Sequence, residues 1–334
     1  MNICLVMAGD EEGGLEKHVV ELAAGLAERG HHVSLIAHEK YRARLHPAID
    51  FYAVNLAKSR RNLIVLFQLW YVLRQIAPDV VHAHGNKAAA MVGPLLRWLR
   101  VGSVATLHSK KNKTKMFAPF DQVIAVSAIA AQTLQHPHIQ VVLNGIASPI
   151  INSCKKVSPP MVLAVGRLVA VKGYDVLLHA WAKLAVPAQL WIAGEGQQHA
   201  KLGQLIQSLG LAQHVQLLGQ RDDIAQLMRQ ATVHVISSHY EGGPYTLAEA
   251  LLVDTPVVGT DVGMMADFVP AIYRCTFNDS DALAHVLTQA LQHSDQLLQD
   301  FLPVFEQAKQ RLTLSAMLDQ VEQVYIDVIA KTAA

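Results

Sequence analysis

The sequence has few cysteines, and their positions exclude two kinds of small stabilised fold. The three residues Cys4, Cys154 and Cys275 are odd in number and far apart. This spacing fits neither a disulfide framework nor a structural zinc site. We therefore expect a reducing compartment, the cytoplasm. Cys4 lies in an apolar stretch and should be a small buried side chain.

Long apolar runs and a strong net charge are also absent. No run approaches the ~20 apolar residues that span a bilayer. The first residues lack the basic stretch and apolar core of a signal peptide. Charged residues make up 16% of the chain and apolar residues 51%, and the net charge is +1. These values predict a compact globular protein, and its 334 residues suit two domains.

Short apolar runs alternate with helical patterns in two successive series. Apolar runs between helices are typical of parallel strands that are covered on both faces. The series predict two Rossmann-like domains, at 1–150 and 151–310, with a boundary in the Pro- and Ser-rich segment 147–160. The expected strands are 2–8, 33–37, 79–83, 103–107, 122–126, 140–143, 161–165, 188–193, 214–218, 232–236 and 256–259. The expected helices are 14–29, 61–76, 86–100, 127–135, 173–184, 198–209, 222–230, 245–253 and a C-terminal stretch at 304–330.

The most informative segment is SSHYEGGPYTLAEAL, at 237–251. Glu241 precedes two glycines, and Glu249 follows it by eight positions in an apolar helical pattern. Pro244 suits the first turn of a helix, and glycines let backbone amides approach a ligand. A helix N-terminus favours phosphate, while carboxylates accept hydrogen bonds from hydroxyls. The segment therefore predicts a nucleotide-sugar site.

Two glutamates eight positions apart in this setting resemble the signature of the retaining glycosyltransferases of family four. Further segments resemble that family in the right order and cover nearly the whole chain. The resemblance implies an α/β GT-B fold, in which two Rossmann-like, doubly wound parallel-sheet domains face a central cleft. It also implies that a last helix, within 311–334, crosses back to the first domain. The matching segments include MNICLVMAGDEEGG (1–14), DVVHAHG (79–85), ATLHS (105–109), DQVIAVS (121–127), VVLNGI (141–146), VGRLVAVKGY (165–174) and LWIAGEG (190–196).

The resemblance implies that the donor binds mainly to the second domain. Arg167 and Lys172 would neutralise the donor diphosphate, and both follow a strand pattern at the end where doubly wound sheets bind ligands. Glu241 would hold the donor sugar, and Glu249 the ribose. The other expected donor contacts are Gly13, Gly14, Gly166, Arg221, Gly243, Pro244, Tyr245 and Thr246.

Several of these residues also have a structural interpretation. His108 resembles the family histidine that reaches the donor sugar, although a lone histidine is more often structural, and His82 and His84 are weaker candidates. Gly13 and Gly14 could form a simple strand-to-helix turn. The chain has no GxGxxG motif, which disfavours a dinucleotide. Asp222 and Asp223 are interpreted as a helix N-cap and a first-turn acid rather than a metal site, and no metal or cofactor is expected.

The distribution of charge favours an anionic partner for the first domain. Residues 1–150 carry 16 Lys/Arg and 10 Asp/Glu, a balance of +6, whereas 151–334 carry 12 and 17, a balance of −5. Residues 40–116 hold 14 basic and 2 acidic side chains, which favours an anionic glycan or glycolipid acceptor or a membrane surface. The segment 58–74 could dock on a membrane, but its almost continuous apolar middle favours a core helix. The lysines that could bind acceptor phosphates are Lys110, Lys111, Lys113 and Lys115.

We therefore expect a retaining glycosyltransferase that moves a hexose or N-acetylhexosamine from a nucleotide-diphosphate sugar to a glycan hydroxyl. A UDP-sugar is favoured over a GDP-sugar, and the acceptor is expected in lipopolysaccharide or envelope polysaccharide synthesis. The enzyme would be cytoplasmic, with the inner face of the membrane as an open alternative, and would bind no nucleic acid. Two alternatives remain: a GT-B-fold sugar-nucleotide epimerase and a non-catalytic nucleotide-sugar-binding subunit.

Overall fold

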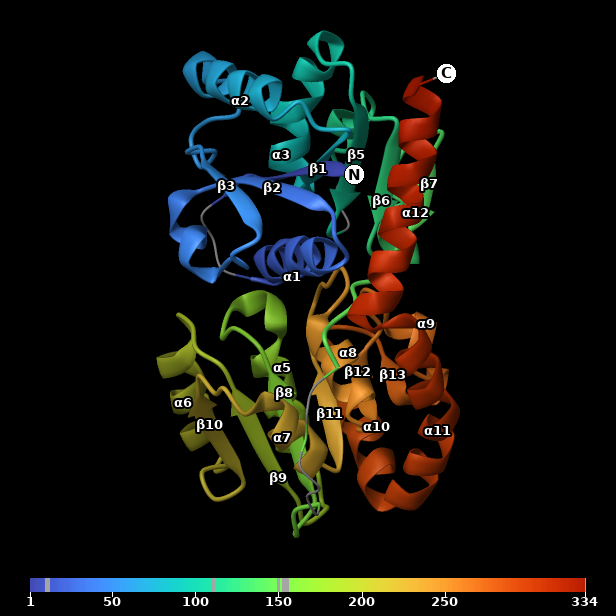
Figure 1. Cartoon of the computed structure of the whole chain (residues 1–334). Helices are drawn as coiled ribbons and strands as arrows, with labels where there is room; N and C mark the ends of the chain where they lie inside the picture. The colour runs from blue at the N-terminus through green and yellow to red at the C-terminus, as the bar shows by residue number, and fades with distance from the viewer. Residues whose placement is uncertain (10–12, 110–111, 149–150, 152–155, 334) are drawn as a thin grey trace. The chain divides into compact units, whose positions relative to one another are not determined.

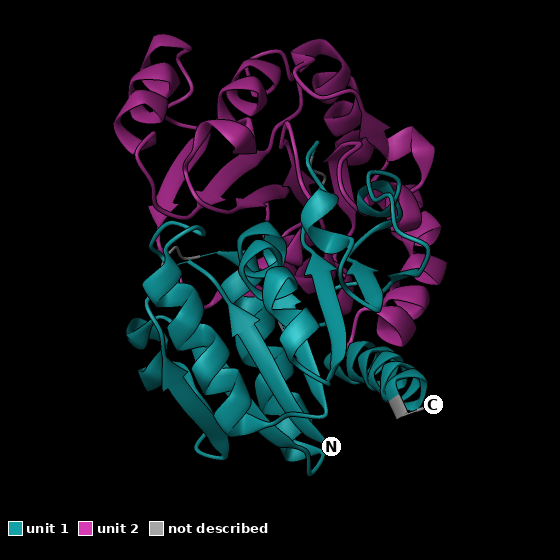
Figure 2. Ribbon diagram, turned by 90° about the horizontal axis from the view of Figure 1, so that it is seen from above, with its two compact units in different colours: residues 1–145, 314–334 teal, residues 146–313 magenta. Residues whose placement is uncertain are grey.

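The chain folds into two compact units (Figures 1 and 2). The computed structural model describes residues 1–9, 13–109, 112–148, 151 and 156–333. Unit 1 comprises Met1–Gly145 together with Leu314–Ala334, and unit 2 comprises Ile146–Thr313. The divisions predicted from the sequence, at 150/151 and 310/311, differ from these by a few residues. Cys154 and the acidic run 10–12 lie outside the described residues.

Unit 1 is built on a seven-stranded parallel sheet with the order β3-β2-β1-β4-β5-β6-β7. All six strands expected in this half are present. The edge strand β3 was not expected, because it buries only Ile49 and so lacks an apolar run. The strands are β1 (Asn2–Met7), β2 (His32–Ala37), β3 (Ile49–Ala53), β4 (Val80–His84), β5 (Gly102–Leu107), β6 (Gln122–Ala125) and β7 (Ile139–Val141).

Helices cover both faces of this sheet, which explains its continuous apolar strands. Side chains alternate along β1, so that Ile3 and Leu5 join one core while Cys4 and Val6 join the other. The expected burial of Cys4 is confirmed. The α-helices of unit 1 are α1 (Gly14–Glu28), α2 (Leu63–Ile76), α3 (Gly85–Val92), α4 (Ala128–Ala131) and α12 (Leu314–Ala333), and its 3₁₀ turns are η1 (Glu39–Arg44), η2 (Gly93–Trp98) and η3 (Lys115–Phe117).

The C-terminal helix α12 is an integral part of unit 1. It packs on α1 and β5, and Gly25 of α1 has no side chain where Leu318 approaches. Arg29 adds an ion pair to Glu322 at 2.7 Å. The helical stretch expected at 304–330 consists of two helices, because α11 (Ser294–Arg311) ends before α12 begins and Thr313 between them forms a bridge with Ile146.

The expectation of a core helix for 58–74 is only partly right. One stripe of α2 is buried, but its opposite stripe is exposed although it is apolar. A run that is apolar on nearly every side does not reveal which side faces the core. No helix among the described residues combines the length and apolar character needed to cross a bilayer.

Unit 2 contains a six-stranded parallel sheet with the order β10-β9-β8-β11-β12-β13. The five expected strands are present, while β13 is too short to produce a pattern. The strands are β8 (Met161–Val165), β9 (Gln189–Ala193), β10 (Val215–Gly219), β11 (Val233–Ile236), β12 (Val257–Thr260) and β13 (Arg274–Cys275). The helices are α5 (Tyr174–Trp181), α6 (His199–Ser208), α7 (Ile224–Gln230), α8 (Tyr245–Leu252), α9 (Met265–Phe268), α10 (Ser280–Gln292) and α11, with 3₁₀ turns η4 (Ala170–Lys172) and η5 (Ala271–Tyr273).

Both sheets reverse their strand order at one point, between β1 and β4 in unit 1 and between β8 and β11 in unit 2. Loops that leave neighbouring strands at such a point diverge, and they form the ligand-binding edge of doubly wound folds. We therefore expect the functional site at the loops that follow these four strands.

A buried histidine in β11 should make unit 2 sensitive to acid. Burial lowers the pKa of His234 from 6.5 to about 4, so the unfolded chain takes up a proton first as the pH falls. The stabilising contribution is complete above pH 6.5 and is lost as the pH falls towards 4. We expect His234→Leu to lower the slope of unfolding free energy against pH in this window by about 1.4 kcal/mol per pH unit. Urea titrations between these pH values measure the slope.

The matched control is Val258→Ala, a buried change in the adjacent strand β12. This variant should lower stability at every pH without changing the slope, since it removes no titrating group. An unchanged slope in His234→Leu would contradict the assignment of acid sensitivity to this imidazole.

Candidate active site

The loops after β8 and β11 meet at the switch point of unit 2. The first runs from Gly166 to Gly173, and the second from Ser237 to Pro244. Because β8 and β11 are parallel neighbours, both loops leave from the same edge of the sheet. Six of the residues predicted to contact the donor lie on these loops: Gly166, Arg167, Lys172, Glu241, Gly243 and Pro244.

A cation and a carboxylate join these two loops. Lys172 Nζ lies 2.6 Å from Glu241 Oε1, with side-chain exposures of 21% and 14%. The Ser238 hydroxyl donates to the same oxygen at 2.7 Å. Glu241 Oε2 has no hydrogen-bond partner among the described residues. One carboxylate oxygen is thus held by the protein, while the other can accept a hydrogen bond from a ligand hydroxyl.

Three further hydrogen bonds fix the backbone around this pair. The Ser237 hydroxyl donates to the carbonyl of Lys172 at 2.9 Å, and the amide of His239 donates to the carbonyl of Val171 at 2.9 Å. Thr260, at the end of β12, donates its hydroxyl to the carbonyl of Ser238 at 2.7 Å. The Lys172–Glu241 geometry is therefore held in place before any ligand arrives.

Two glycines in the first loop are required by sterics. Gly173 has φ +62°, and a Cβ there would collide with the carbonyl oxygen of Ser237. Gly166 has φ +151°, and its Cβ would come within 3.3 Å of the Lys172 side chain and 2.9 Å of the Tyr174 hydroxyl. The glycines thus allow the loops to pack closely and leave room for the lysine.

Tyr174, the first residue of α5, is buried and is affected by the charge of Glu241. Burial raises the pKa of the Tyr174 phenol, and the Glu241 carboxylate raises it further. The phenol therefore stays protonated and can act as a donor in this part of the site.

The helix α8 begins directly after the second loop. Pro244 lies at its N-cap rather than in its first turn as expected, with ψ 119°. Tyr245 and Thr246 open the helix, and Glu249 lies half-buried one turn further on. The first amides of a helix have no intrahelical partner, so they can meet an anion.

Arg167 and Arg221 differ in their availability. Arg167 is exposed and makes no ion pair with any described residue. Arg221 follows β10, two strands away from β8, and its guanidinium contacts Asp223 at 2.8 and 2.6 Å. The N-cap of α7 is Asp223 rather than Asp222, its side chain makes no capping bond, and the first turn of the helix contains no acid, so the expected first-turn acid is wrong. Arg221 would have to exchange this partner to contact a donor.

The corresponding edge of unit 1 carries clustered imidazoles. His84 Nδ1 lies 3.3 Å from His108 Nε2, and the His18 ring meets His108 edge-on at a centroid distance of 4.8 Å. His18 also hydrogen-bonds Asn144. His82, by contrast, is used inside the unit, where it contacts Tyr325 Oη at 2.6 Å and Thr106 Oγ1 at 2.7 Å.

These imidazoles are neutral near neutral pH. Burial lowers the pKa of His18 to about 4. Burial and then the neighbouring imidazoles, with His82 foremost, lower the pKa of His84 well below its ordinary value. Burial, followed by His18 and His82, does the same to His108, whose ring remains partly accessible. His108 can therefore hydrogen-bond a hydroxyl as donor or acceptor without bringing a charge.

The imidazole cluster is also where a metal could bind among the described residues. One nitrogen from each of His18, His84 and His108 lies within 4.8 Å of the others. A tetrahedral zinc with Zn–N bonds of about 2.0–2.1 Å holds its nitrogens roughly 3.3 Å apart, and the His84–His108 separation is 3.3 Å. This separation equally suits an N–H···N hydrogen bond between two neutral rings. The sequence predicted no metal, and the cluster itself was not foreseen.

The remaining residues of unit 1 that the sequence analysis singled out lie at the start of α1, after His108 and next to the division between the units. Gly13 is the N-cap of α1, and Gly14 is its first residue. Lys113 and Lys115 are exposed beyond His108, whereas Lys110 and Lys111 lie outside the described residues. Asn144 is buried and packs against His18, directly before the division between the units at Gly145.

Sequence reasoning missed the residues that hold the predicted ones. Ser237 and Ser238 open the segment 237–251, but two serines before a loop form no distinctive sequence pattern. Tyr174 lies at the start of an expected helix, and no local pattern in the sequence assigns its phenol to the site. His18 follows Gly14 by four positions, one helical turn, and this spacing was the available signal that it faces the same ligand edge.

Solved structures of other proteins share the fold of this chain. The fold closely matches a crystal structure of Anabaena Alr3699/HepE in complex with UDP and glucose, with a TM-score of 0.81 at 18% identity over 97% of this chain and 99% of that one. A sucrose-phosphate synthase from Thermosynechococcus elongatus matches with a TM-score of 0.84 at 19% identity over 98% and 99%. The expected GT-B fold, with two Rossmann-like parallel-sheet domains, is confirmed.

The family follows from the sequence. Residues 12–148 match the model of Glycosyltransferase Family 4, and residues 151–301 match that of Glycosyl transferases group 1. The two models together cover most of the chain, which therefore belongs to the glycosyltransferases that they describe. It is 27% identical to a phosphatidyl-myo-inositol mannosyltransferase of Mycobacterium leprae, over 95% of this chain and 93% of that protein. It is 25% identical to the lipopolysaccharide core biosynthesis glycosyltransferase LpsE of Rhizobium meliloti, over 75% and 76%.

The steric role of Gly173 can be tested by adding a single methyl group. We expect Gly173→Ala to destabilise unit 2 by about 2 kcal/mol or more, because alanine is disfavoured at positive φ and its Cβ would strike Ser237. Urea unfolding followed by circular dichroism measures the loss. Gly203→Ala in α6 is the control, since nothing lies within 4 Å of the added Cβ, and it should gain up to about 1 kcal/mol. Equal stability of the two variants would rule out the steric argument.

Proposed function

We propose that the protein transfers a sugar from a nucleotide-diphosphate sugar with retention of anomeric configuration, and that unit 2 binds the donor. The observation that carries the proposal is the Lys172–Glu241 pair at the switch point of the unit 2 sheet. A donor of this kind brings a diphosphate and several hydroxyls to one place. The pair offers an ammonium for the first and a free carboxylate oxygen for the second.

Lys172, Arg167 and the first amides of α8 would bind the diphosphate. An ammonium has three protons, so Lys172 can keep its contact with Glu241 and still donate to phosphate oxygens. Arg167 would add a forked pair of donors. When the bond from the anomeric carbon to the phosphate oxygen breaks, negative charge develops on the diphosphate. Fixed donors aimed at that charge stabilise the transition state, each by roughly 3 kcal/mol.

The glutamates would orient the two hydroxyl-bearing parts of the donor. Glu241 Oε2 would accept a hydrogen bond from the transferred sugar, while Lys172 and Ser238 hold Oε1. Glu249, on the helix behind the loop, would accept from the ribose. In unit 1, neutral His108 would contact the sugar, and Gly13 and Gly14 would allow the backbone to approach the diphosphate.

Retention can proceed through a covalent glycosyl–enzyme intermediate or by attack from the side that the leaving group departs. The first course needs a carboxylate nucleophile, whereas the role proposed for Glu241 is to bind hydroxyls of the transferred sugar. The acceptor hydroxyl would instead attack the anomeric carbon from the side that the diphosphate leaves. Its oxygen forms the new bond, its proton passes to a phosphate oxygen, and the diphosphate departs with the bonding electrons.

A UDP-sugar is the favoured donor, and an anionic glycan or glycolipid is the favoured acceptor. The matching Anabaena structure was solved with UDP and glucose, and relatives include a lipopolysaccharide core enzyme and a phosphatidyl-myo-inositol mannosyltransferase. The 14 basic and 2 acidic residues of 40–116 support an anionic acceptor on unit 1. A hexosyl transfer in lipopolysaccharide or envelope polysaccharide synthesis fits these features.

A sugar-nucleotide epimerase of the same fold remains the second candidate. An epimerase consumes its nucleotide sugar without an acceptor, whereas a transferase needs one. Donor turnover that requires added acceptor glycan would therefore support transfer, and equal turnover without acceptor would support the epimerase. Donor binding without turnover under either condition would point to a non-catalytic subunit.

The carboxylate of Glu241 can be tested with an isosteric change. Glu241→Gln should reduce the transfer rate roughly 100-fold or more, since it replaces one carboxylate oxygen by an NH₂ group and removes the negative charge that pairs with Lys172. Steady-state release of nucleoside diphosphate in the presence of acceptor measures this rate. Glu306→Gln, an exposed carboxylate of α11, is the control and should retain full activity. Near-normal turnover in Glu241→Gln would remove this residue from the mechanism.

The ammonium of Lys172 can be tested without catalysis. UDP at about 100 times its dissociation constant should stabilise the wild-type protein by about 2.7 kcal/mol. Lys172→Gln should bind UDP more weakly and lose most of this shift at the same concentration, as measured by thermal unfolding. Lys183→Gln, an exposed lysine of unit 2 paired with Asp281 at 2.7 Å, should retain the full shift. A full UDP shift in Lys172→Gln would place the diphosphate elsewhere.

A further inference from the structure

Helix α2 of unit 1 exposes large apolar side chains along one face. Leu63, Phe67 and Tyr71 recur every four residues, so they share a stripe, and Ile64 lies beside them. Their exposed fractions are 79%, 63%, 51% and 72% for Leu63, Phe67, Tyr71 and Ile64. The opposite stripe faces the core and consists of Val65, Leu69 and Leu73. The helix is therefore fixed to unit 1 by one side only.

An exposed tryptophan extends this apolar face. Trp98 ends the 3₁₀ turn η2 and is 52% exposed. Trp98 and the C-terminal part of α2 line the same hollow of about 430 Å³, together with Arg74 and Arg100. The α2 stripe and Trp98 thus belong to one continuous surface.

Positive charge surrounds these apolar side chains. Arg74 lies on the exposed side of α2, and the Arg97 guanidinium stacks on the Trp98 ring at 3.8 Å from its centroid. Arg74, Arg97 and Arg100 make no ion pair with any residue that the structure describes. Three more exposed cations precede the helix: Lys58, Arg60 and Arg61.

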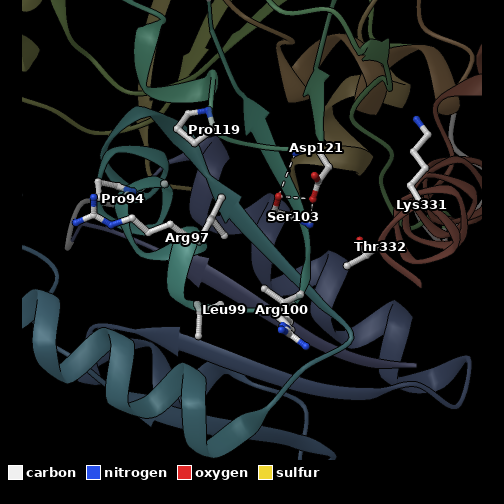
Figure 3. Close-up of a pocket in the computed structure, with 12 residues that line it drawn as sticks. Pro94, Arg97, Leu99, Arg100, Ser103, Pro119, Asp121, Lys331 and Thr332 are labelled. Atoms are coloured by element: carbon white, nitrogen blue, oxygen red, sulfur yellow. Dashed lines mark hydrogen bonds between the residues drawn. The ribbon is translucent and has the colours of Figure 1, made fainter. Parts of the chain in front are cut away.

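A second, wider hollow lies on the other side of Arg100. It has a volume of about 860 Å³, and Arg97, Arg100 and Lys331 contribute cations to its lining. Figure 3 shows Lys331 on the C-terminal helix, across the hollow from the two arginines. The lining of this hollow also includes the carboxylate of Asp121, which already accepts hydrogen bonds from the amide and the hydroxyl of Ser103 at 2.9 and 2.6 Å. The hollow therefore retains a surplus of positive charge.

This surface lies at the amino ends of the unit 1 strands. The two hollows are lined by residues at the starts of β4 and β5, such as Val81 and Ser103. His84 and His108 lie at the opposite, carboxyl ends of the same strands. The apolar and basic surface is thus separate from the ligand edge of unit 1.

We propose that this surface, formed by Leu63, Ile64, Phe67, Tyr71, Trp98, Arg74, Arg97 and Arg100, docks unit 1 on an anionic lipid bilayer. Apolar side chains on one helix face would enter the boundary between headgroups and acyl chains. Tyr71 and Trp98 are residue types that favour this boundary. The arginines would meet lipid phosphates, with the two hollows able to receive headgroups. A second copy of the chain fits less well, because a two-fold contact would bring the same arginines together.

The inference deepens the proposed function, since a membrane-bound enzyme would meet a glycolipid acceptor where that acceptor resides. Binding to vesicles needs neither donor nor turnover. A failure of membrane docking and a failure of the proposed transfer can therefore be told apart.

Co-sedimentation with lipid vesicles tests the proposal. The full chain should bind vesicles of phosphatidylcholine with one-third phosphatidylglycerol much more tightly than pure phosphatidylcholine. The triple variant Leu63→Gln, Ile64→Gln and Phe67→Gln should lose at least tenfold in partition coefficient. The triple variant Arg74→Gln, Arg97→Gln and Arg100→Gln should lose about fivefold per arginine on the anionic vesicles.

A matched control carries the same chemical change elsewhere. Ile272→Gln, Phe277→Gln and Ile326→Gln alter three side chains that are 61%, 52% and 51% exposed, and this variant should bind vesicles like the wild type. A circular dichroism spectrum and a thermal unfolding transition like those of the wild type would show that the α2 variant is folded. Wild-type vesicle binding by the α2 variant would overturn the proposal. So would a dimer in sedimentation equilibrium that the α2 changes convert to a monomer, because a second copy would then cover the face.

Discussion

The ion pair between Lys172 and Glu241 is the interaction on which the site of unit 2 depends. It joins two loops that leave neighbouring parallel strands, and it is only partly exposed. Ser238 shares the carboxylate oxygen that Lys172 contacts, which leaves the other oxygen without a described partner. A single pair thus fixes the loops and presents both a cation and an acceptor. These are the two groups that a nucleotide-diphosphate sugar requires.

The sheet topology brings the loops of Lys172 and Glu241 to the same edge, and a glycine allows their backbones to approach closely. The reversal of strand order between β8 and β11 gives both loops the same edge. Their approach then depends on Gly173, where a Cβ would meet the carbonyl of Ser237. Hydrogen bonds from the Ser237 hydroxyl and the His239 amide hold the backbones of the two loops together. Preorganisation here comes from the backbone and small side chains, so that Lys172 and Glu241 need little rearrangement when a ligand binds.

Unit 1 separates two kinds of chemistry at the two ends of one sheet. The carboxyl ends of β4 and β5 carry imidazoles that burial keeps neutral, including His84 and His108. The amino ends of the same strands adjoin an apolar and basic surface formed by α2 and η2. Neutral donors and acceptors suit contact with a sugar, whereas exposed apolar groups with unpaired arginines suit a lipid surface. Part of the positive charge in the first half of the sequence therefore lies on the α2 and η2 surface, which is separate from the ligand edge.

The fold class, the family and some residues at the ligand edge, such as Lys172 and Glu241, could be predicted from the sequence. Buried parallel strands leave continuous apolar runs, and ligand loops leave glycines and charged residues at strand ends, so both are visible locally. The partners of those residues become known only when the chain is folded. Ser238 on Glu241, His18 beside His108 and Tyr325 on His82 are contacts between distant segments with no local pattern. The tertiary structure also decided which side of α2 faces outward, because a helix that is apolar all round carries no such information until the rest of the unit packs against it.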